Sequence, residues 1–220
     1  MRKEPLITGE YYHIYNRGVD KRDIFNDLHD SERFKESIKE FNQVDIVGSL
    51  QRQHKVVRAL DPNYCKKPLV AIVCFCVNPN HFHFVLKQLV DGGIAKFMQK
   101  LLGGYTSFFN QKHQRSGSLF QGTFKSKLLS DEGYFRKIFA YVNQNYLVHS
   151  IPAEKLKFIF ASDAEYSKGN FDFIDAQEGK EMLEVFDGEA GFKNHCKEII
   201  SLIREERGAP SLNEPDELPC

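Results

Sequence analysis

Two histidines separated by one residue, His81 and His83, are the clearest chemical feature of this 220-residue sequence. They begin an expected strand over residues 81–87, and alternate side chains of a strand point to the same face. Both imidazoles therefore project to one side, where two neutral rings can supply half of a divalent metal site. The same spacing also occurs among ordinary surface or packed histidines, so the pair alone does not define a metal site.

Tyr141 and Asn145 form a second candidate pair, in an expected helix from Asp131 to about Tyr146. Residues four apart are neighbours on one helix face. A tyrosine hydroxyl can attack phosphorus, and an asparagine carbonyl oxygen can complete the ligand set of a metal ion. The alternative is that Tyr141 is a core aromatic residue and Asn145 caps the end of the helix.

The spacing of apolar residues indicates the elements that position these side chains. The order of strand, helix, strand, strand, helix, strand, helix predicts an α+β fold, a ferredoxin-like split βαβ arrangement with a central antiparallel sheet and helices on one face. The expected strands cover residues 11–15, 69–77, 81–87 and 119–129, and the expected helices follow an N-cap at Asp30 or Ser31, span residues 94–113 and follow an N-cap at Ser130.

The formal net charge is zero, but the charges are unevenly distributed. Residues 1–150 hold 22 Lys and Arg against 14 Asp and Glu, whereas residues 151–220 hold 8 against 16. This asymmetry of +8 and −8 favours an anionic partner for the first part. We expect one domain over residues 1–150 with an exposed insertion at 43–67, an acidic, partly helical extension at 151–207, and a disordered tail at 208–220.

Several protein classes do not fit the composition. No stretch approaches the roughly 20 apolar residues of a membrane span, and no apolar signal core follows the first five residues. Five cysteines, an odd number, favour free thiols in a reducing cytoplasm. Cys74 and Cys76 could join His81 and His83 in a zinc site, but their apolar strand favours the role of small hydrophobic residues.

Five segments in this order make the sequence resemble the single-tyrosine HUH transposases, and more narrowly the REP-associated tyrosine transposases. The resemblance extends from about Tyr11 to Ala161, with a looser match at residues 186–188. The segments are IYNRGVDKR at residues 14–22, PNHFH at 79–83, YTSFFN at 105–110, GSLFQG at 117–122 and YVNQN at 141–145.

The resemblance implies a metal-dependent transposase that cleaves and rejoins single-stranded DNA at hairpin or repeat ends. In that reading, His81, His83 and Asn145 hold Mg²⁺ or Mn²⁺. Tyr141 attacks a DNA phosphate to give a 5′-phosphotyrosine and a free 3′-hydroxyl. The resemblance also implies a homodimer. No general base is evident from the sequence.

The sequence departs from this family at two points. Tyr146 follows Asn145 where such proteins commonly have proline, which adds a second phenol, and Tyr134, two helical turns before Tyr141, is the best competing nucleophile. Thr123 stands where a basic residue is common, and Lys125 and Lys127, which alternate on the same expected strand, are candidates to compensate. The candidate DNA-binding residues, each of which could instead be an ordinary solvated charge, are Arg17, Lys21, Arg22, Lys96, Lys100, Lys112, Arg115, Lys125 and Lys127.

A second class of function uses the same scaffold without catalysis. It comprises an inactive or domesticated transposase relative that only binds DNA, and an RNA-binding module. An RNA-binding sheet would display stacking aromatic residues on its open face, whereas the complete set of two histidines, tyrosine and asparagine favours retained chemistry.

Overall fold

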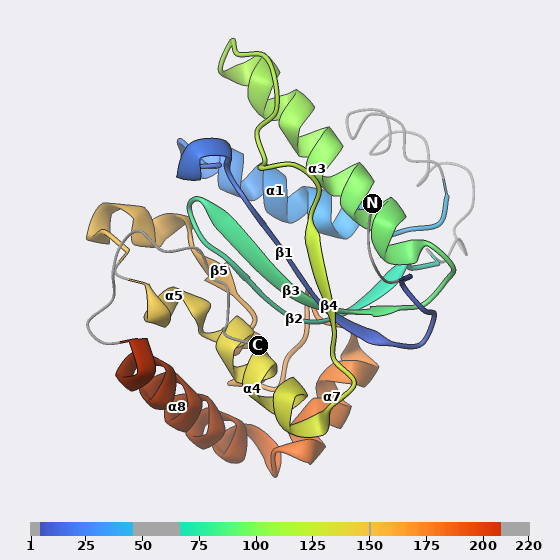
Figure 1. Cartoon of the computed structure of the whole chain (residues 1–220), viewed down its shortest axis with the longest axis vertical. Coiled ribbons are helices and arrows are strands. Elements are labelled where there is room, and N and C mark those ends of the chain that lie inside the picture. Colours follow the sequence, from blue (N-terminus) through green and yellow to red (C-terminus); the bar gives the residue numbers. More distant parts are fainter. Residues whose placement is uncertain (1–4, 46–66, 150, 208–220) are drawn as a thin grey trace.

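Five antiparallel strands form a single sheet in the order β4-β1-β3-β2-β5 (Figure 1). The computed structural model describes residues 5–45, 67–149 and 151–207, so most of the expected insertion and the expected tail lie outside the described residues. The first four strands have the order of a ferredoxin-like sheet, which confirms the predicted fold class. The strands are β1 (Tyr11–Arg17), β2 (Val70–Val77), β3 (His81–Gln88), β4 (Lys125–Leu128) and β5 (Phe160–Ala161).

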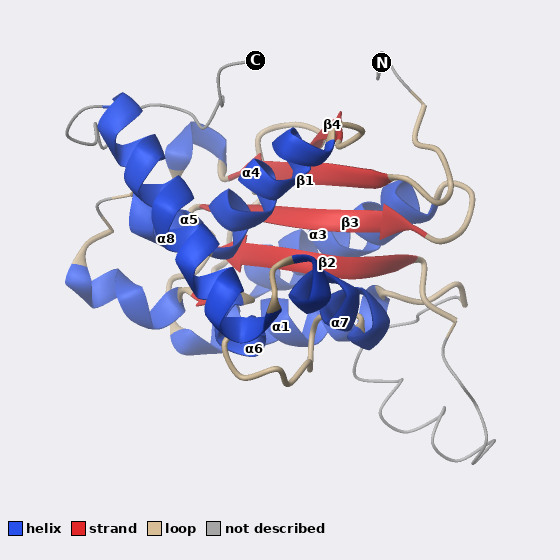
Figure 2. Cartoon of the chain, turned by 90° about the horizontal axis from the view of Figure 1, so that it is seen from below, coloured by secondary structure: helices blue, strands red, loops and turns tan. Residues whose placement is uncertain are grey.

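Helices pack on both faces of this sheet, where the sequence predicted them on one (Figure 2). Phe82 on β3 points towards α1 (Leu28–Phe41) and α3 (Gly93–Lys112) and contacts Phe34 at 6.0 Å between ring centroids. The histidines of β3 point to the opposite face, which is covered by α4 (Glu132–Asn143), α7 (Ala176–Val185) and α8 (Gly188–Arg207). Strands β4 and β5 are the two edge strands of the sheet.

Two predicted boundaries differ for local reasons. Helix α1 begins at Leu28, three or four residues earlier than expected from an N-cap at Asp30 or Ser31, because Asp27 is the N-cap and Asp30 completes a capping box with it. Strand β4 covers only Lys125–Leu128 of the expected 119–129, because Gly122 has a φ of +65° and breaks the extended backbone. Upstream of this glycine, Phe120 forms only an isolated bridge with Gly18.

The third expected helix is divided at Gln144, and its N-cap is Asp131, not Ser130. Helix α4 ends at Asn143, and a separate short helix, α5 (Asn145–Val148), follows after Gln144. The buried amide of Asn143 donates from Nδ2 to the Phe139 carbonyl oxygen at 2.9 Å and accepts from Ser162 Oγ at 2.6 Å. These bonds hold the end of α4, so Tyr141 and Asn145 do not share one continuous helix.

The chain after residue 151 packs against the sheet and α4. Strand β5 pairs with β2, and Phe192 of α8 contacts Phe139 of α4 at 5.9 Å between ring centroids. In the described ranges, none of the helices is long and apolar enough to cross a membrane. The remaining short helices are η1 (Val19–Lys21), η2 (Ala153–Phe158) and α6 (Asp163–Tyr166).

Candidate active site

The two histidines of β3 lie on the face of the sheet that α4 covers. His81 pairs in register with Arg17 of β1, and His83 pairs with Tyr15, so all four side chains project from the same face. The His81 and His83 ring centroids are 5.3 Å apart, and their planes are nearly perpendicular at 85°. Strand alternation therefore brings both imidazoles to one place, as predicted from the sequence.

Asn78 and Asn80, in the turn between β2 and β3, contact the two ring nitrogens of His81. Asn80 Oδ1 lies 2.6 Å from His81 Nδ1, which as a donor to this oxygen carries the proton. Asn78 Nδ2 lies 2.9 Å from His81 Nε2, which then accepts. Asn78 is completely buried at the end of β2. The sequence analysis used residues 78–80 as a break between strands and residues 79–80 as part of a matching segment, but it gave neither asparagine a role in holding His81.

Asn145 brings its amide oxygen to the same histidine. Its Oδ1 lies 3.0 Å from His81 Nε2 and accepts a hydrogen bond of 2.6 Å from Asn78 Nδ2. With the His81 proton on Nδ1, Nε2 and Oδ1 face each other as two acceptors. If a metal ion lies about 2.1 Å from each of two ligand atoms and the two bonds form a right angle, the ligand atoms are about 3 Å apart. The donor set therefore fits a divalent cation.

The third donor of such a set is an amide, not a carboxylate, thiolate or imidazole. Among the described residues, no three His, Cys, Asp or Glu side chains form a group that could hold a metal ion. Cys74 is buried, and its Sγ lies 3.9 Å from the Phe139 carbonyl oxygen. Burial also raises the pKa of this thiol well above its usual value. Within the described part of the chain, the two cysteines therefore do not complete a zinc site with the histidines.

His13 of β1 is a site residue that the sequence reasoning missed. It is 4% exposed, and its Nε2 lies 2.9 Å from His83 Nδ1. Its ring stacks with Tyr15 at 4.9 Å between centroids. The signal was available, because His13 and Tyr15 alternate on a predicted strand and must share a face. Their pairing with the second histidine depended on the register of β1 and β3.

Tyr141 lies beside His83 with its side chain completely buried. The two ring centroids are 5.4 Å apart in an edge-to-face arrangement. Tyr134, the competing phenol, is partly exposed at the start of α4, and Lys127 Nζ lies 4.5 Å from its ring centroid. Tyr146 donates to Asp163 Oδ2 at 2.7 Å, and burial together with this carboxylate raises the pKa of the Tyr146 hydroxyl.

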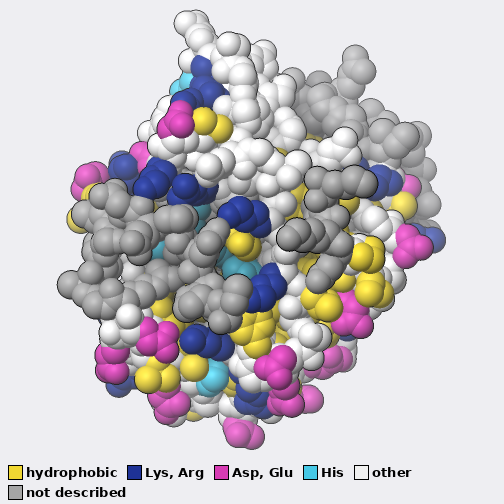
Figure 3. Space-filling model, in the orientation of Figure 1, with side chains coloured by type: hydrophobic (Ala, Val, Ile, Leu, Met, Phe, Trp, Pro, Cys, Tyr) yellow, Lys and Arg dark blue, Asp and Glu magenta, His cyan; other side chains and the backbone are white. Residues whose placement is uncertain are grey.

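Three of the nine candidate DNA-binding residues lie next to the histidines on the same sheet face. Arg17 is the cross-strand neighbour of His81 and donates to Gln121 Oε1 at 2.7 Å. Lys125 and Lys127 are exposed on β4, and Lys125 Nζ lies 5.7 Å from the Tyr15 ring centroid. Figure 3 shows basic side chains and histidines near the middle of this face, with many acidic side chains towards its rim.

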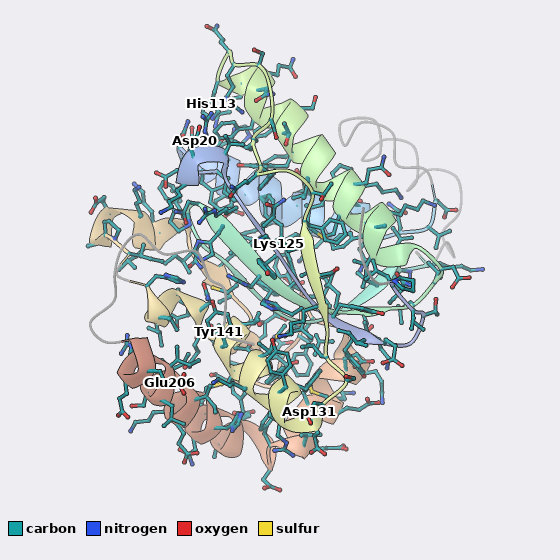
Figure 4. All side chains as sticks on the ribbon, viewed as in Figure 1. Asp20, His113, Lys125, Asp131, Tyr141 and Glu206 are labelled. Carbon is teal, nitrogen blue, oxygen red and sulfur yellow. The ribbon has the colours of Figure 1, made fainter. Side chains whose placement is uncertain are left out.

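The other six candidates lie in or just after η1 and in or just after α3. The Lys21 carbonyl oxygen accepts from Asn80 Nδ2 at 3.3 Å, so the η1 turn lies beside the asparagine that contacts His81. Figure 4 labels Asp20 of η1 and His113, which follows α3, at one end of the molecule, with Tyr141 and Lys125 nearer the centre. Several of these six bind other parts of the chain. Lys112 bonds Asp27 and Asp30, Arg115 bonds Asn110, Lys96 and Lys100 bond backbone carbonyls at residues 43–45, and Lys21 and Arg22 belong to the turn after β1.

Two solved structures are similar to this chain at low sequence identity. The chain is similar in structure, with 13% identity and a TM-score of 0.47, to a REP-associated tyrosine transposase bound to a REP hairpin, over 80% of this chain and 92% of that one. It is also similar to tRNA(His) guanylyltransferase from Saccharomyces cerevisiae, with 12% identity and a TM-score of 0.31, over 98% of this chain and 85% of that one.

No curated protein matches the sequence. The family model for IS200-like transposases matches residues 49–145, a segment that holds both histidines of β3, Tyr141 and Asn145. The match stops at Asn145, the residue whose amide meets His81. Residues 49–145 therefore match the family of IS200-like transposases.

Proposed function

We propose that this transposase cleaves and rejoins single-stranded DNA at hairpin or repeat ends, with a divalent metal ion and a 5′-phosphotyrosine intermediate. The main structural support for this proposal is that His81 Nε2 lies 3.0 Å from Asn145 Oδ1 and that Tyr141 packs against the neighbouring His83. Two imidazoles, an amide oxygen and a phenol thus meet at one end of the sheet. The family match over the same residues supports the proposal.

In this proposal His81, His83 and Asn145 hold Mg²⁺ or Mn²⁺, which supplies charge to polarise a phosphoryl oxygen and orient the leaving group. Tyr141 Oη forms the new bond to phosphorus, and the bond between phosphorus and the 3′ oxygen breaks. The phenolic proton ends on the released 3′-hydroxyl, so atoms and charge balance. Asn80 and Asn78 keep His81 in the tautomer that offers Nε2.

The buried position of Tyr141 sets a condition on this reaction. A completely buried hydroxyl cannot touch a DNA phosphate, so helix α4 has to expose Tyr141 when substrate binds. Helix α4 ends at Asn143, and Asn145 lies in the separate helix α5. Movement of α4 can therefore displace Tyr141 without requiring Asn145 to leave His81.

The DNA path in this proposal crosses the outer strands of the sheet. Arg17, Lys125 and Lys127 provide positive charge beside the histidines, and Tyr15 offers an aromatic ring that unpaired bases can stack on. The homodimer and the cytoplasmic location expected from the sequence remain parts of this proposal. A soluble DNA hairpin is the partner to test first.

The test is incubation of the protein with Mn²⁺ and labelled hairpin DNA, followed by denaturing electrophoresis and mass spectrometry. We expect a covalent adduct at Tyr141 that Tyr141→Phe abolishes and Tyr134→Phe retains. An adduct that persists in Tyr141→Phe would exclude Tyr141 as the nucleophile.

A non-catalytic nucleic-acid-binding protein is the second candidate, and the complete burial of Tyr141 favours it. The same experiment separates the two. Hairpin binding without any adduct, across a library of hairpin sequences, would support the binding protein. RNA binding in preference to DNA would support the RNA-binding form of this alternative.

A further inference from the structure

His13 is buried next to the proposed metal site, although the proposed reaction uses it neither as a ligand nor as a nucleophile. It is 4% exposed and His83 is 1% exposed, so their contact is shielded from water. Nε2 of His13 lies 2.9 Å from Nδ1 of His83, which is hydrogen-bond distance between two ring nitrogens. A neutral imidazole has one donor and one acceptor nitrogen, so exactly one of the two rings donates here.

The direction of this bond decides whether His83 can bind a metal. If His13 donates, the neutral His83 ring carries its proton on Nε2 and that nitrogen has no lone pair for a metal ion. If His83 donates from Nδ1, its Nε2 is the basic nitrogen. The partner of one ring nitrogen thus sets the role of the other.

We propose that His13 is a positioning residue that accepts the Nδ1 proton of His83 and thereby holds His83 in the tautomer that offers Nε2 to the metal ion. The inference rests on the proposed function, because that function assigns Nε2 of His83 to the metal. It adds a specific role for β1, a strand outside the segment that the family model matches.

The surroundings of His13 restrict the orientation of its ring. Its plane is 17° from that of His83, at 5.1 Å between centroids, and 26° from that of Tyr15, at 4.9 Å. The Tyr15 and His83 centroids are themselves 5.7 Å apart, and Tyr141 meets the His13 ring edge-on at 6.4 Å. A buried ring in contact with three others has little freedom to turn, so Nε2 stays directed at His83.

The partner of His81 supports the same arrangement for His83. Nδ1 of His81 lies 2.6 Å from Asn80 Oδ1, an oxygen that can only accept. Metal-bound histidines usually donate their second ring nitrogen to such an acceptor, which fixes the tautomer and raises the basicity of the ligand. His13 provides the equivalent acceptor for His83, with an imidazole in place of an amide.

The tautomer of His83 can be measured directly in the metal-free full-length protein. Nitrogen-15 NMR of the imidazole rings at neutral pH distinguishes a protonated from an unprotonated nitrogen. We expect His83 in the wild type to be protonated on Nδ1 and unprotonated on Nε2. Protonation on Nε2 in the wild type would overturn the proposal, and this result does not depend on any variant.

Two substitutions test the energetic consequence. His13→Phe keeps an aromatic ring in the stack but removes the acceptor, and we expect Mn²⁺ affinity to fall about 10- to 100-fold. His13→Gln retains a carbonyl acceptor, and we expect it to recover most of that affinity. His29→Phe, on α1 beside Phe108, is the matched control and should bind Mn²⁺ like the wild type.

Calorimetry measures the Mn²⁺ affinity, and chemical unfolding of each metal-free variant measures stability. If His13 only packs, His13→Phe will bind Mn²⁺ as tightly as the wild type, and the proposal fails. If the tautomer and affinity change as expected but the wild type forms no adduct with DNA, the role of His13 stands and the proposed cleavage fails. The two hypotheses are therefore tested separately.

Discussion

The contacts of Asn145 distinguish two possible roles for its side chain, that of a metal ligand and that of a purely structural amide. Its Oδ1 meets both Asn78 Nδ2 and His81 Nε2, and its side chain is completely buried. Among the described residues, its Nδ2 has no hydrogen-bond partner. A buried asparagine with a purely structural role would be expected to form hydrogen bonds through both the oxygen and the nitrogen of its amide. The contacts of Asn145 instead involve the oxygen.

We predict opposite responses to Mn²⁺ for two substitutions of Asn145. Asn145→Asp buries a carboxylate and should lower the unfolding temperature without metal, because a buried charge needs a partner. Mn²⁺ should then raise that temperature more than in the wild type, because binding to the folded state stabilises it. Asn145→Ala should lose most of the Mn²⁺ response. Equal thermal shifts in all three proteins would show that Asn145 is not a ligand.

Asp163 provides a prediction for pH dependence. Burial raises the pKa of its carboxyl, and the hydrogen bond from Tyr146 opposes that shift without cancelling it. The folded protein therefore binds a proton more tightly than the unfolded chain, and this contribution to stability is lost as pH rises through the raised pKa. Relative to Asp163→Asn, which keeps an acceptor oxygen for Tyr146, the wild type should lose stability as pH rises.

Urea unfolding of both proteins between about pH 4 and about pH 7 measures this difference. We expect the free energies of unfolding of the wild type and Asp163→Asn to diverge with rising pH. Parallel curves would show that the carboxyl of Asp163 titrates alike in the folded and unfolded states.

At the scale of elements, the junction of α4 and α5 is held by Ser162. The Phe75 backbone N–H donates to Ser162 Oγ at 2.8 Å, and this hydroxyl donates to Asn143 Oδ1 at 2.6 Å. Strand β2 is thus tied to the last residue of α4. Asn145 begins the next helix, so the same bonds locate the amide that meets His81.

Ser162→Ala should destabilise the protein by about 1–3 kcal/mol, because it leaves the buried Phe75 N–H without this acceptor. Ser37→Ala is the control, since Ser37 is equally buried but donates only to the Arg33 carbonyl of its own helix. Alanine is a better helix former than serine at this position, so the free energy of unfolding should change by close to zero. Denaturant unfolding compares the two, and equal losses would contradict the special role of Ser162.

At the scale of the whole molecule, a buried ion pair connects the acidic C-terminal segment to the sheet. Glu178 of α7 accepts from Lys87 at 2.6 Å and from the Tyr11 hydroxyl at 2.8 Å. Its side chain is 6% exposed. The division of the chain at residue 150 remains a prediction from composition, whereas this contact makes joint unfolding of the two parts the physical expectation.

Glu178→Gln should lower the free energy of unfolding by about 1–3 kcal/mol, because two donors lose a charged acceptor. Glu184→Gln, exposed on the same helix, should change it by less than about 0.5 kcal/mol. We expect one transition, coincident in far- and near-ultraviolet circular dichroism. Two separated transitions would show that residues 151–207 fold independently of the sheet.

The sequence was sufficient to predict an element where the pattern that defines it lies in neighbouring residues. The apolar run of β2, the alternation of β3 and the periodicity of α3 each arise from neighbouring residues, and these elements were predicted to within one residue at most ends. The cap of α1 was missed because Asp27, Asp30 and Ser31 are all suitable residue types. Only the formed capping box distinguishes them.

The sequence by itself determined that two imidazoles share a strand face, that Tyr141 and Asn145 follow at a fixed spacing, and that the chain resembles a transposase. The tertiary structure decided that Asn145 contacts His81 from a separate helix, that His13 lies at hydrogen-bond distance from His83, and that Tyr141 is buried. The physical reason is separation along the chain. Alternation and helical period depend on adjacent residues, whereas contacts across 60 to 70 positions depend on strand register and on how α4 packs.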